Sequence, residues 1–340
     1  MKKGLAILCA VLMLLGVAGC NGREDCGEMP SGVQSGVQSD VQSDTQSDVQ
    51  SGVQSDTQSG AEQTPVRKSK AEYMHISFDD TQTCFRNLAV NGYESVWEEP
   101  FFAWLFQLRE RYGARFSLYT YTSVLQGVGE KYAKEFQEAS EWLKMGFHAD
   151  TSGHNLSEIS YQTGKAYWNA FVAQVARVTG GVDNLDRLPR LEFFSGSKDA
   201  LLGMRDGDCG AVGFLSADDS RNSYYFTEQE TEYLYTRDCF TDGENGLVFF
   251  ATDIRGDWFS GNFSTQNAYR KPLKATVKDE LVYRERTGAF DEAWKSVIFF
   301  THEWQVYDGQ SVNVKGAWVE QACDYAREFE IPFDYPQNRT

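Results

Sequence analysis

Two adjacent carboxylates, Asp79 and Asp80, come directly after the apolar, strand-like run His-Ile-Ser-Phe at residues 75–78. Carboxylates this close repel one another, so water, a cation or a division of chemical roles has to relieve the repulsion. One acid could bind a cation while the other takes a proton from water. The alternative is a helix cap or a solvated loop, which an Asp-Asp pair without further context most often forms.

Histidines stand at similar positions elsewhere. Of the four histidines in the chain, His148 and His302 directly follow apolar runs. His154 lies six residues beyond His148, whereas His75 lies inside the first run and is expected to be a core residue. If the runs are parallel strands of a barrel, their carboxyl ends meet on one face, where such folds place their chemistry. Two further acids in or after apolar runs are Glu192 and Asp253.

One of the two acids and two histidines would form an oxygen and nitrogen ligand set that suits zinc or another divalent transition metal. Three protein ligands leave a position open for water, whose pKa a metal can lower to about 7. The second carboxylate would stand beside this water and take its proton. The cysteines show no CxxC spacing, so a cysteine-based zinc site is not indicated.

Strand-like and helix-like segments alternate along the chain, which predicts an α/β fold, a distorted (β/α) barrel of about seven strands. Apolar runs that read as strands cover residues 73–78, 114–119, 145–147, 188–194, 211–215, 247–251 and 297–300. Amphipathic stretches that read as helices cover residues 97–108, 130–143, 158–178, 228–235 and 314–329.

The run Ser77-Phe78-Asp79-Asp80-Thr81 resembles the first motif of the polysaccharide deacetylase (NodB homology) family, a strand that ends in Thr-Phe-Asp-Asp-Gly. The resemblance implies a barrel of the glycoside hydrolase and deacetylase type, with Asp79 as general base and Asp80 as a metal ligand. The run from Val297 to His302 is similar to the family's last motif, a hydrophobic strand that delivers a histidine. His302 would then be the general acid for the leaving amine.

The other motifs are altered. The family completes its metal site with two histidines three residues apart, for which this chain has His148 and His154, with Asp150 as a substitute ligand. Arg190, in the place of the family's third motif but without its Pro, would orient Asp79. Asp257 and Trp258 are similar to an Asp-Trp motif at the substrate, and Trp258 would line the acetyl pocket. Thr81 replaces a Gly, so the turn after the acids must differ, because a β-branched residue does not easily adopt a positive φ.

The resemblance implies a metal-dependent hydrolase, with zinc as the expected metal, that removes N- or O-acetyl groups from a polysaccharide and acts on C–N amide bonds. Two other functions stay open. A glycoside hydrolase on a related barrel would use two separated acids, and Asp218 and Asp219 form a second acid pair after an apolar run. A carbohydrate-binding protein could retain the fold without turnover.

The N-terminal segment concerns targeting. Lys2 and Lys3 precede an apolar run from Leu5 to Val17, which is shorter than the about 20 residues of a membrane span. The sequence Val-Ala-Gly-Cys at residues 17–20 resembles the lipobox of bacterial lipoproteins. It implies a signal peptide at residues 1–19 and a lipidated Cys20 that anchors the protein to the extracytoplasmic face of the cell membrane.

A four-residue unit, Ser-Gly/Asp-Val/Thr-Gln, is repeated seven times from Ser31 to Gln58. It contains no Leu, Ile or aromatic residue and therefore cannot form a core. We interpret residues 20–70 as a disordered tether and residues 71–340 as one barrel domain.

The formal net charge of −17 argues against binding to nucleic acid. We expect a monomer whose partners are a polysaccharide and, through the lipid, the membrane. The chain has seven cysteines, and a disulfide between Cys209 and Cys239 is one open option.

Overall fold

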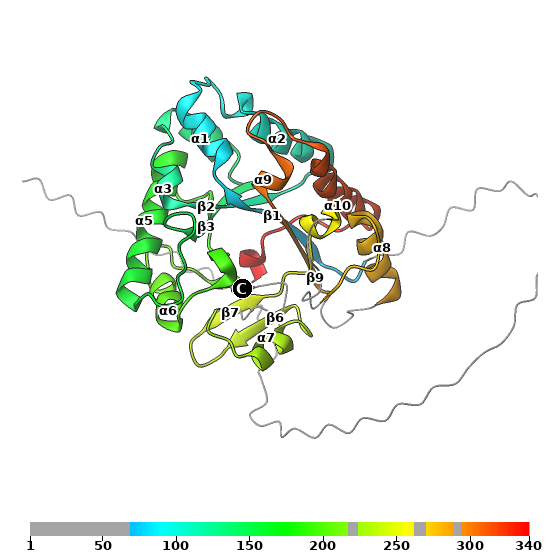
Figure 1. Cartoon of the computed structure of the whole chain (residues 1–340). Helices are drawn as coiled ribbons and strands as arrows, with labels where there is room; N and C mark the ends of the chain where they lie inside the picture. The colour runs from blue at the N-terminus through cyan, green and yellow to red at the C-terminus, as the bar shows by residue number, and fades with distance from the viewer. Residues whose placement is uncertain (1–68, 217–223, 262–269, 289–293, 340) are drawn as a thin grey trace, which may run out of the picture.

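The computed structural model describes residues 69–216, 224–261, 270–288 and 294–339 (Figure 1). The predicted signal peptide, the predicted lipidation site Cys20, nearly all of the predicted tether, and the pair Asp218 and Asp219 lie outside these residues. The strands are β1 (Tyr73–Thr81), β2 (Phe116–Tyr121), β3 (Leu143–Ala149), β4 (Leu185–Asp186), β5 (Gly213–Leu215), β6 (Cys239–Asp242), β7 (Leu247–Phe250), β8 (Ile254–Arg255) and β9 (Ser296–His302).

Six strands form one parallel sheet in the order β4-β3-β2-β1-β9-β8, with β1 inside it. A second sheet has the order β5-β7-β6, in which β6 is antiparallel to β7. Backbone N–H groups of Val212 and Leu215 donate to the carbonyls of Arg187 and Pro189, which connects the chain after β4 to β5. The predicted α/β fold with a barrel-like parallel sheet is therefore confirmed, although strand pairing in the described residues does not close the barrel.

Helices surround the strands (Figure 1). They are α1 (Thr83–Val90), α2 (Pro100–Tyr112), α3 (Thr122–Leu125), α4 (Ala133–Glu138), α5 (Tyr161–Thr179), α6 (Lys198–Arg205), α7 (Glu228–Leu234), α8 (Val277–Thr287), α9 (Glu303–Val306) and α10 (Ala317–Glu328). Short 3-10 turns include η1 (Val96–Glu98), η2 (Glu130–Tyr132), η3 (Glu192–Phe194), η4 (Gly256–Ser260), η6 (Val314–Gly316) and η7 (Pro336–Arg339).

Helix α2 illustrates why these elements form. The side chain of Glu99 caps its first turn, Pro100 starts it, and Gly113, with φ of 71°, ends it in the left-handed conformation. Its apolar stripe is buried, and the ring of Phe101 packs edge-on against Phe78 of β1 at 5.1 Å. The helix therefore covers the strand that carries the acid pair.

The predicted strand over residues 188–194 is wrong in its position. β4 ends at Asp186, and Glu192–Phe194 form the 3-10 turn η3. Phe193 and Phe194 have φ values of 58° and 53°, which lie in the left-handed region and are incompatible with an extended strand.

The cysteines do not pair as considered. Cys239 is disulfide-bonded, but Cys209 is free and exposed, so a Cys209–Cys239 bond is not formed. Cys84 and Cys323 are free and buried. In the part of the chain that the structure describes, no helix combines the length and apolarity that a membrane span needs.

Candidate active site

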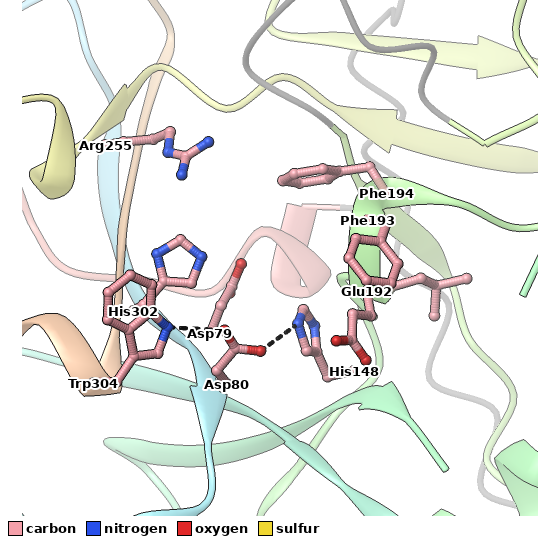
Figure 2. A pocket seen from close by; sticks show the side chains of 10 residues that line it. Asp79, Asp80, His148, Glu192, Phe193, Phe194, Arg255, His302 and Trp304 are labelled. Atoms are coloured by element: carbon pink, nitrogen blue, oxygen red, sulfur yellow. Dashed lines mark hydrogen bonds and ion pairs between the residues drawn. The ribbon is translucent and has the colours of Figure 1, made fainter. Parts of the chain in front are cut away.

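The carboxyl ends of β1, β3 and β9 bring Asp79, Asp80, His148 and His302 to one cavity of about 380 Å³ (Figure 2). The sequence predicts that these residues meet on one face, because they follow apolar runs. The rest of the lining comes from residues at and next to η3, from β8 and from α9, namely Leu191, Glu192, Phe193, Phe194, Arg255 and Trp304.

A β-bulge allows both acids to face the cavity. Phe78 of β1 pairs with Leu118 of β2, but the next paired residue of β1 is Thr81, opposite Thr120. Asp79 and Asp80 thus oppose a single residue, which interrupts the alternation of side chains along the strand. Asp80 has φ of 56°, a conformation that Asp tolerates better than most residues. The positive φ falls on Asp80, while Thr81 remains in β1 with no left-handed backbone.

Asp79 is buried and is held by Arg190. The Nη1 atom of Arg190 donates to Asp79 Oδ1 and to Ser77 Oγ, each at 2.9 Å. The guanidinium itself is fully buried and lies over the ring of Phe300, 4.2 Å from its centroid. Arg190 therefore stands where the prediction placed it, and its packing fixes the orientation of the Asp79 carboxylate.

Three side chains converge on the carboxylate of Asp80. The Tyr121 hydroxyl donates to Oδ1 at 2.5 Å. The indole Nε1 of Trp304 donates to Oδ2 at 3.0 Å, and His148 Nε2 lies 3.4 Å from Oδ1 (Figure 2). Burial by itself would raise the pKa of Asp80, but the interactions with His148 and Tyr121 outweigh it and hold the pKa well below its usual range. Asp80 is consequently a carboxylate at neutral pH.

His148 is oriented by the carbonyl of Arg190, to which its Nδ1 is hydrogen-bonded at 2.5 Å. A proton on Nδ1 leaves Nε2 directed at Asp80, the arrangement typical of metal-binding histidines. Burial would lower the pKa of His148, but the hydrogen bond to Asp80 and the charges of both acids raise it above its ordinary value. Asp80 and His148 are thus an oxygen and a nitrogen donor side by side on the cavity wall.

His154 does not lie on this wall. Its Nδ1 is paired with Asp150 Oδ1, and its ring packs edge-on against Tyr167 of α5. The loop is held by Glu192, whose carboxylate accepts the backbone N–H of Gly153 at 2.9 and 2.8 Å. Within the described ranges, no group of three or more His, Cys, Asp or Glu side chains is placed to hold a metal ion. Asp80 and His148 therefore offer a divalent cation a donor set of two residues. The predicted third ligand, His154, and its substitute, Asp150, bind each other instead.

His302 is supported from behind by a buried acid. Its Nδ1 lies 3.3 Å from Asp257 Oδ2, at ion-pair distance but outside hydrogen-bond geometry. Arg255 Nε and Nη2 donate to the two oxygens of Asp257 at 2.9 and 2.7 Å. Burial would raise the pKa of Asp257, but His302 and Arg255 outweigh it and lower the pKa to about 2. Asp257 is therefore a carboxylate whose negative charge lies next to the His302 ring.

Asp257 and Trp258 are placed differently from their predicted role at the substrate. Asp257 has no exposed surface, and Trp258 is packed in the main core and absent from the cavity lining. The turn η4 directs Asp257 inward, where it forms an ion pair with Arg255 and lies next to His302. Asp253 is similarly buried, in an ion pair with Arg270, and does not line the cavity.

Two exposed aromatic side chains at the cavity were not identified from the sequence. Phe193 is 52% exposed and Trp304 is 54% exposed, and both line the cavity. Trp304 lies two residues after His302, in α9, so its position beside a strand-end histidine was a usable signal. Phe193 had none, because its place depends on the left-handed turn η3.

No family model and no curated protein sequence matches the chain. Solved structures do match. A family 4 acetyl xylan esterase from Clostridium thermocellum, in complex with a cobalt ion, is 8% identical, with 78% of this chain and 89% of that chain covered and a TM-score of 0.42. The polysaccharide deacetylase Bc1974 from Bacillus cereus is 11% identical, with 77% and 91% covered and a TM-score of 0.35.

A 4-alpha-glucanotransferase from Thermococcus litoralis is also similar, at 11% identity, with 78% of this chain and 37% of that chain covered and a TM-score of 0.45. The polysaccharide deacetylases that the sequence resembles are thus present among the structural matches.

Proposed function

We propose that this protein is a hydrolase that removes N- or O-acetyl groups from a polysaccharide, with Asp79 as general base and His302 as general acid. The observation that carries this proposal is the pairing of the two residues. They are partners in the register of β1 and β9, and both line one cavity. A base and an acid on neighbouring strand ends can act on the two sides of one scissile bond.

The side chains divide the reaction between them. Asp79, oriented by Arg190, accepts a proton as water adds to the acetyl carbonyl carbon. His302, with Nδ1 toward Asp257, can donate a proton from Nε2 to the departing nitrogen or oxygen as its bond to the carbonyl carbon breaks. The products are acetate and a free amine or hydroxyl on the sugar. Asp257 lies behind the ring, 3.3 Å from Nδ1, so that Nε2 is the nitrogen left to face the substrate.

Asp80 and His148 would hold a divalent metal, for which zinc is our proposal. The orientation of His148 by the Arg190 carbonyl and the proximity of a carboxylate support this assignment. When bound, the metal would supply a Lewis acid that polarises the acetyl carbonyl.

The exposed rings of Phe193 and Trp304 support a polysaccharide substrate, because aromatic faces offer apolar contact area to the C–H groups of a sugar ring. The apolar side chains of Leu191 and Phe194 offer a wall for the acetyl methyl group. We further propose that the lipid at Cys20 holds the enzyme on the outer face of the membrane, so that its substrate is a cell-envelope or environmental glycan.

The test is acetate release from N-acetylglucosamine oligomers and acetylated xylan by the full-length protein in detergent. We expect Asp79→Asn and His302→Gln each to lower the rate by about 100-fold or more, the usual contribution of a general acid or base. Asp199→Asn, a change of the same type on the exposed first turn of α6, is the matched control. Release of new reducing ends without acetate would make the protein a glycosidase and overturn the proposal, as would unchanged acetate release in both variants.

A further inference from the structure

Trp304 combines an exposed ring with a hydrogen bond to the acid of the metal site. Its indole Nε1 donates to Asp80 Oδ2 at 3.0 Å, although 54% of the residue is exposed (Figure 2). The ring also lies 5.3 Å from the ring of His302. The donor is 224 residues away from Asp80 in the chain, so the contact depends on the position of α9 beside the end of β1.

The other two partners of Asp80 contact the oxygen that Trp304 leaves free. Tyr121 and His148 both approach Oδ1, whereas Trp304 approaches Oδ2. A carboxylate accepts about four hydrogen bonds or ligand contacts. A cation that binds Oδ2 at the lone pair to which the indole N–H donates has to displace that N–H.

Of the three side chains that contact Asp80, only that of Trp304 is exposed enough to move away from the carboxylate. Tyr121 and His148 are buried and packed in the sheet. The backbone under Trp304 is fixed, because the neighbouring Glu303 is fully buried and accepts the backbone N–H groups of Gln82, Thr83 and Cys84 at 2.7 to 2.9 Å. A change of position at Trp304 is therefore a rotation of the side chain into solvent and not a movement of α9.

We propose that Trp304 is a latch on Asp80: its indole N–H holds the carboxylate in the absence of a cation and has to be released when a divalent cation binds at Asp80 and His148. The proposal rests on the metal site of the proposed function. Trp304 acts in it as a positioning residue that weakens cation binding and sets the orientation of Asp80.

The central experiment compares metal affinities. The full-length protein, Trp304→Phe and Asp80→Ala are treated with a chelator and titrated with Zn²⁺ in a calorimeter. Phenylalanine keeps the aromatic ring beside His302 and removes the N–H donor. We expect Trp304→Phe to bind Zn²⁺ about fivefold more tightly than the wild type, which corresponds to about 1 kcal/mol, and Asp80→Ala to lose binding. Trp97→Phe is the matched control, because Trp97 stacks on Trp142 and does not line the cavity.

The outcomes separate the latch from the metal site. If the wild type binds Zn²⁺ and Asp80→Ala does not, the metal site stands. Equal or weaker binding by Trp304→Phe would then overturn the latch alone. If neither the wild type nor Trp304→Phe binds Zn²⁺, both the metal site and the latch are wrong.

Tryptophan fluorescence gives a second readout that a purely structural role of Trp304 would not change. Because the indole leaves Asp80 for solvent, we expect Zn²⁺ to shift the emission of the wild type and of Trp97→Phe to longer wavelength. Trp304→Phe lacks the moving indole and should show no shift. A shift of equal size in Trp304→Phe would contradict the release of Trp304.

Discussion

The buried charge of Asp257 leads to a quantitative prediction for Asp257→Asn. Asparagine has nearly the same shape and can still accept a hydrogen bond from Arg255, so the substitution removes mainly the charge. The pKa of Asp257 is about 2 in the folded protein, against about 3.9 in an unfolded chain. A difference of about two units corresponds to roughly 2 to 3 kcal/mol of folding free energy at neutral pH.

The sign of this contribution determines its pH dependence. Because folding depresses the pKa of Asp257, its stabilising effect is complete above about pH 4 and is lost as the pH falls toward 2. We therefore expect Asp257→Asn to be less stable than the wild type by roughly 2 to 3 kcal/mol at pH 7 and pH 5, and the difference to shrink below pH 4.

Urea denaturation followed by circular dichroism at pH 7, 5, 4 and 3 measures these differences. Activity supplies a second readout, because loss of the charge behind His302 should lower the rate of acetate release by about 100-fold. Asp199→Asn serves again as the exposed control, with a change of no more than about 0.5 kcal/mol at pH 7 and pH 5. A stability difference for Asp257→Asn that stays the same from pH 7 to pH 3 would refute the assigned role of the charge.

Three further predictions concern other parts of the molecule. Burial raises the pKa of Asp238 to about 6, so the free energy of unfolding should fall as the pH rises from 4 to 6. Asp238→Asn should remove this fall in urea titrations, and an unchanged pH profile would contradict the assignment to Asp238. A Cβ at Gly164 would lie 2.4 Å from the carbonyl oxygen of Ala200, so Gly164→Ala should separate α5 from α6 and lower the free energy of unfolding by about 1 to 3 kcal/mol. Gly181→Ala is the control, because a Cβ there has nothing within 4 Å and should change the free energy of unfolding little. Equal effects of the two substitutions would contradict the close contact at Gly164. Phe193→Asn should relieve left-handed strain of about 1 kcal/mol and yet raise the KM for an acetylated glycan; an unchanged KM would exclude Phe193 from substrate binding.

Strands β1 and β9, which carry Asp79, Asp80 and His302, could be predicted because the surrounding elements bury them on both faces. Parallel strands that are buried on both faces are nearly continuous apolar runs, and β1 and β9 are buried along almost their whole length. The same pattern places polar residues at the carboxyl ends, where the chain leaves the core. This is why Asp79, Asp80, His148 and His302 could be identified together.

The region after β4 could not be predicted in the same way. The sequence from Arg190 to Phe194 is apolar enough to read as a strand, but the backbone turns through two left-handed residues there. Neither Phe193 nor Phe194 has an intrinsic preference for that conformation. Tertiary contacts select it, for example the backbone N–H of Tyr224, which donates to the Phe194 carbonyl.

The acid pair, Asp79 and Asp80, illustrates what can be predicted from the sequence and what depends on the folded structure. The amino-acid pattern is enough to predict that two carboxylates follow an apolar strand and that histidines follow two others, because apolar runs and their lengths are local properties of the chain. The folded packing alone shows that a bulge turns both acids to one cavity, that Arg190 holds Asp79 and that Trp304 holds Asp80. The hydrogen bonds of Arg190 and Trp304 join residues more than 100 positions apart. Their geometry depends on how strands and loops pack, which the spacing of residues along the chain does not encode.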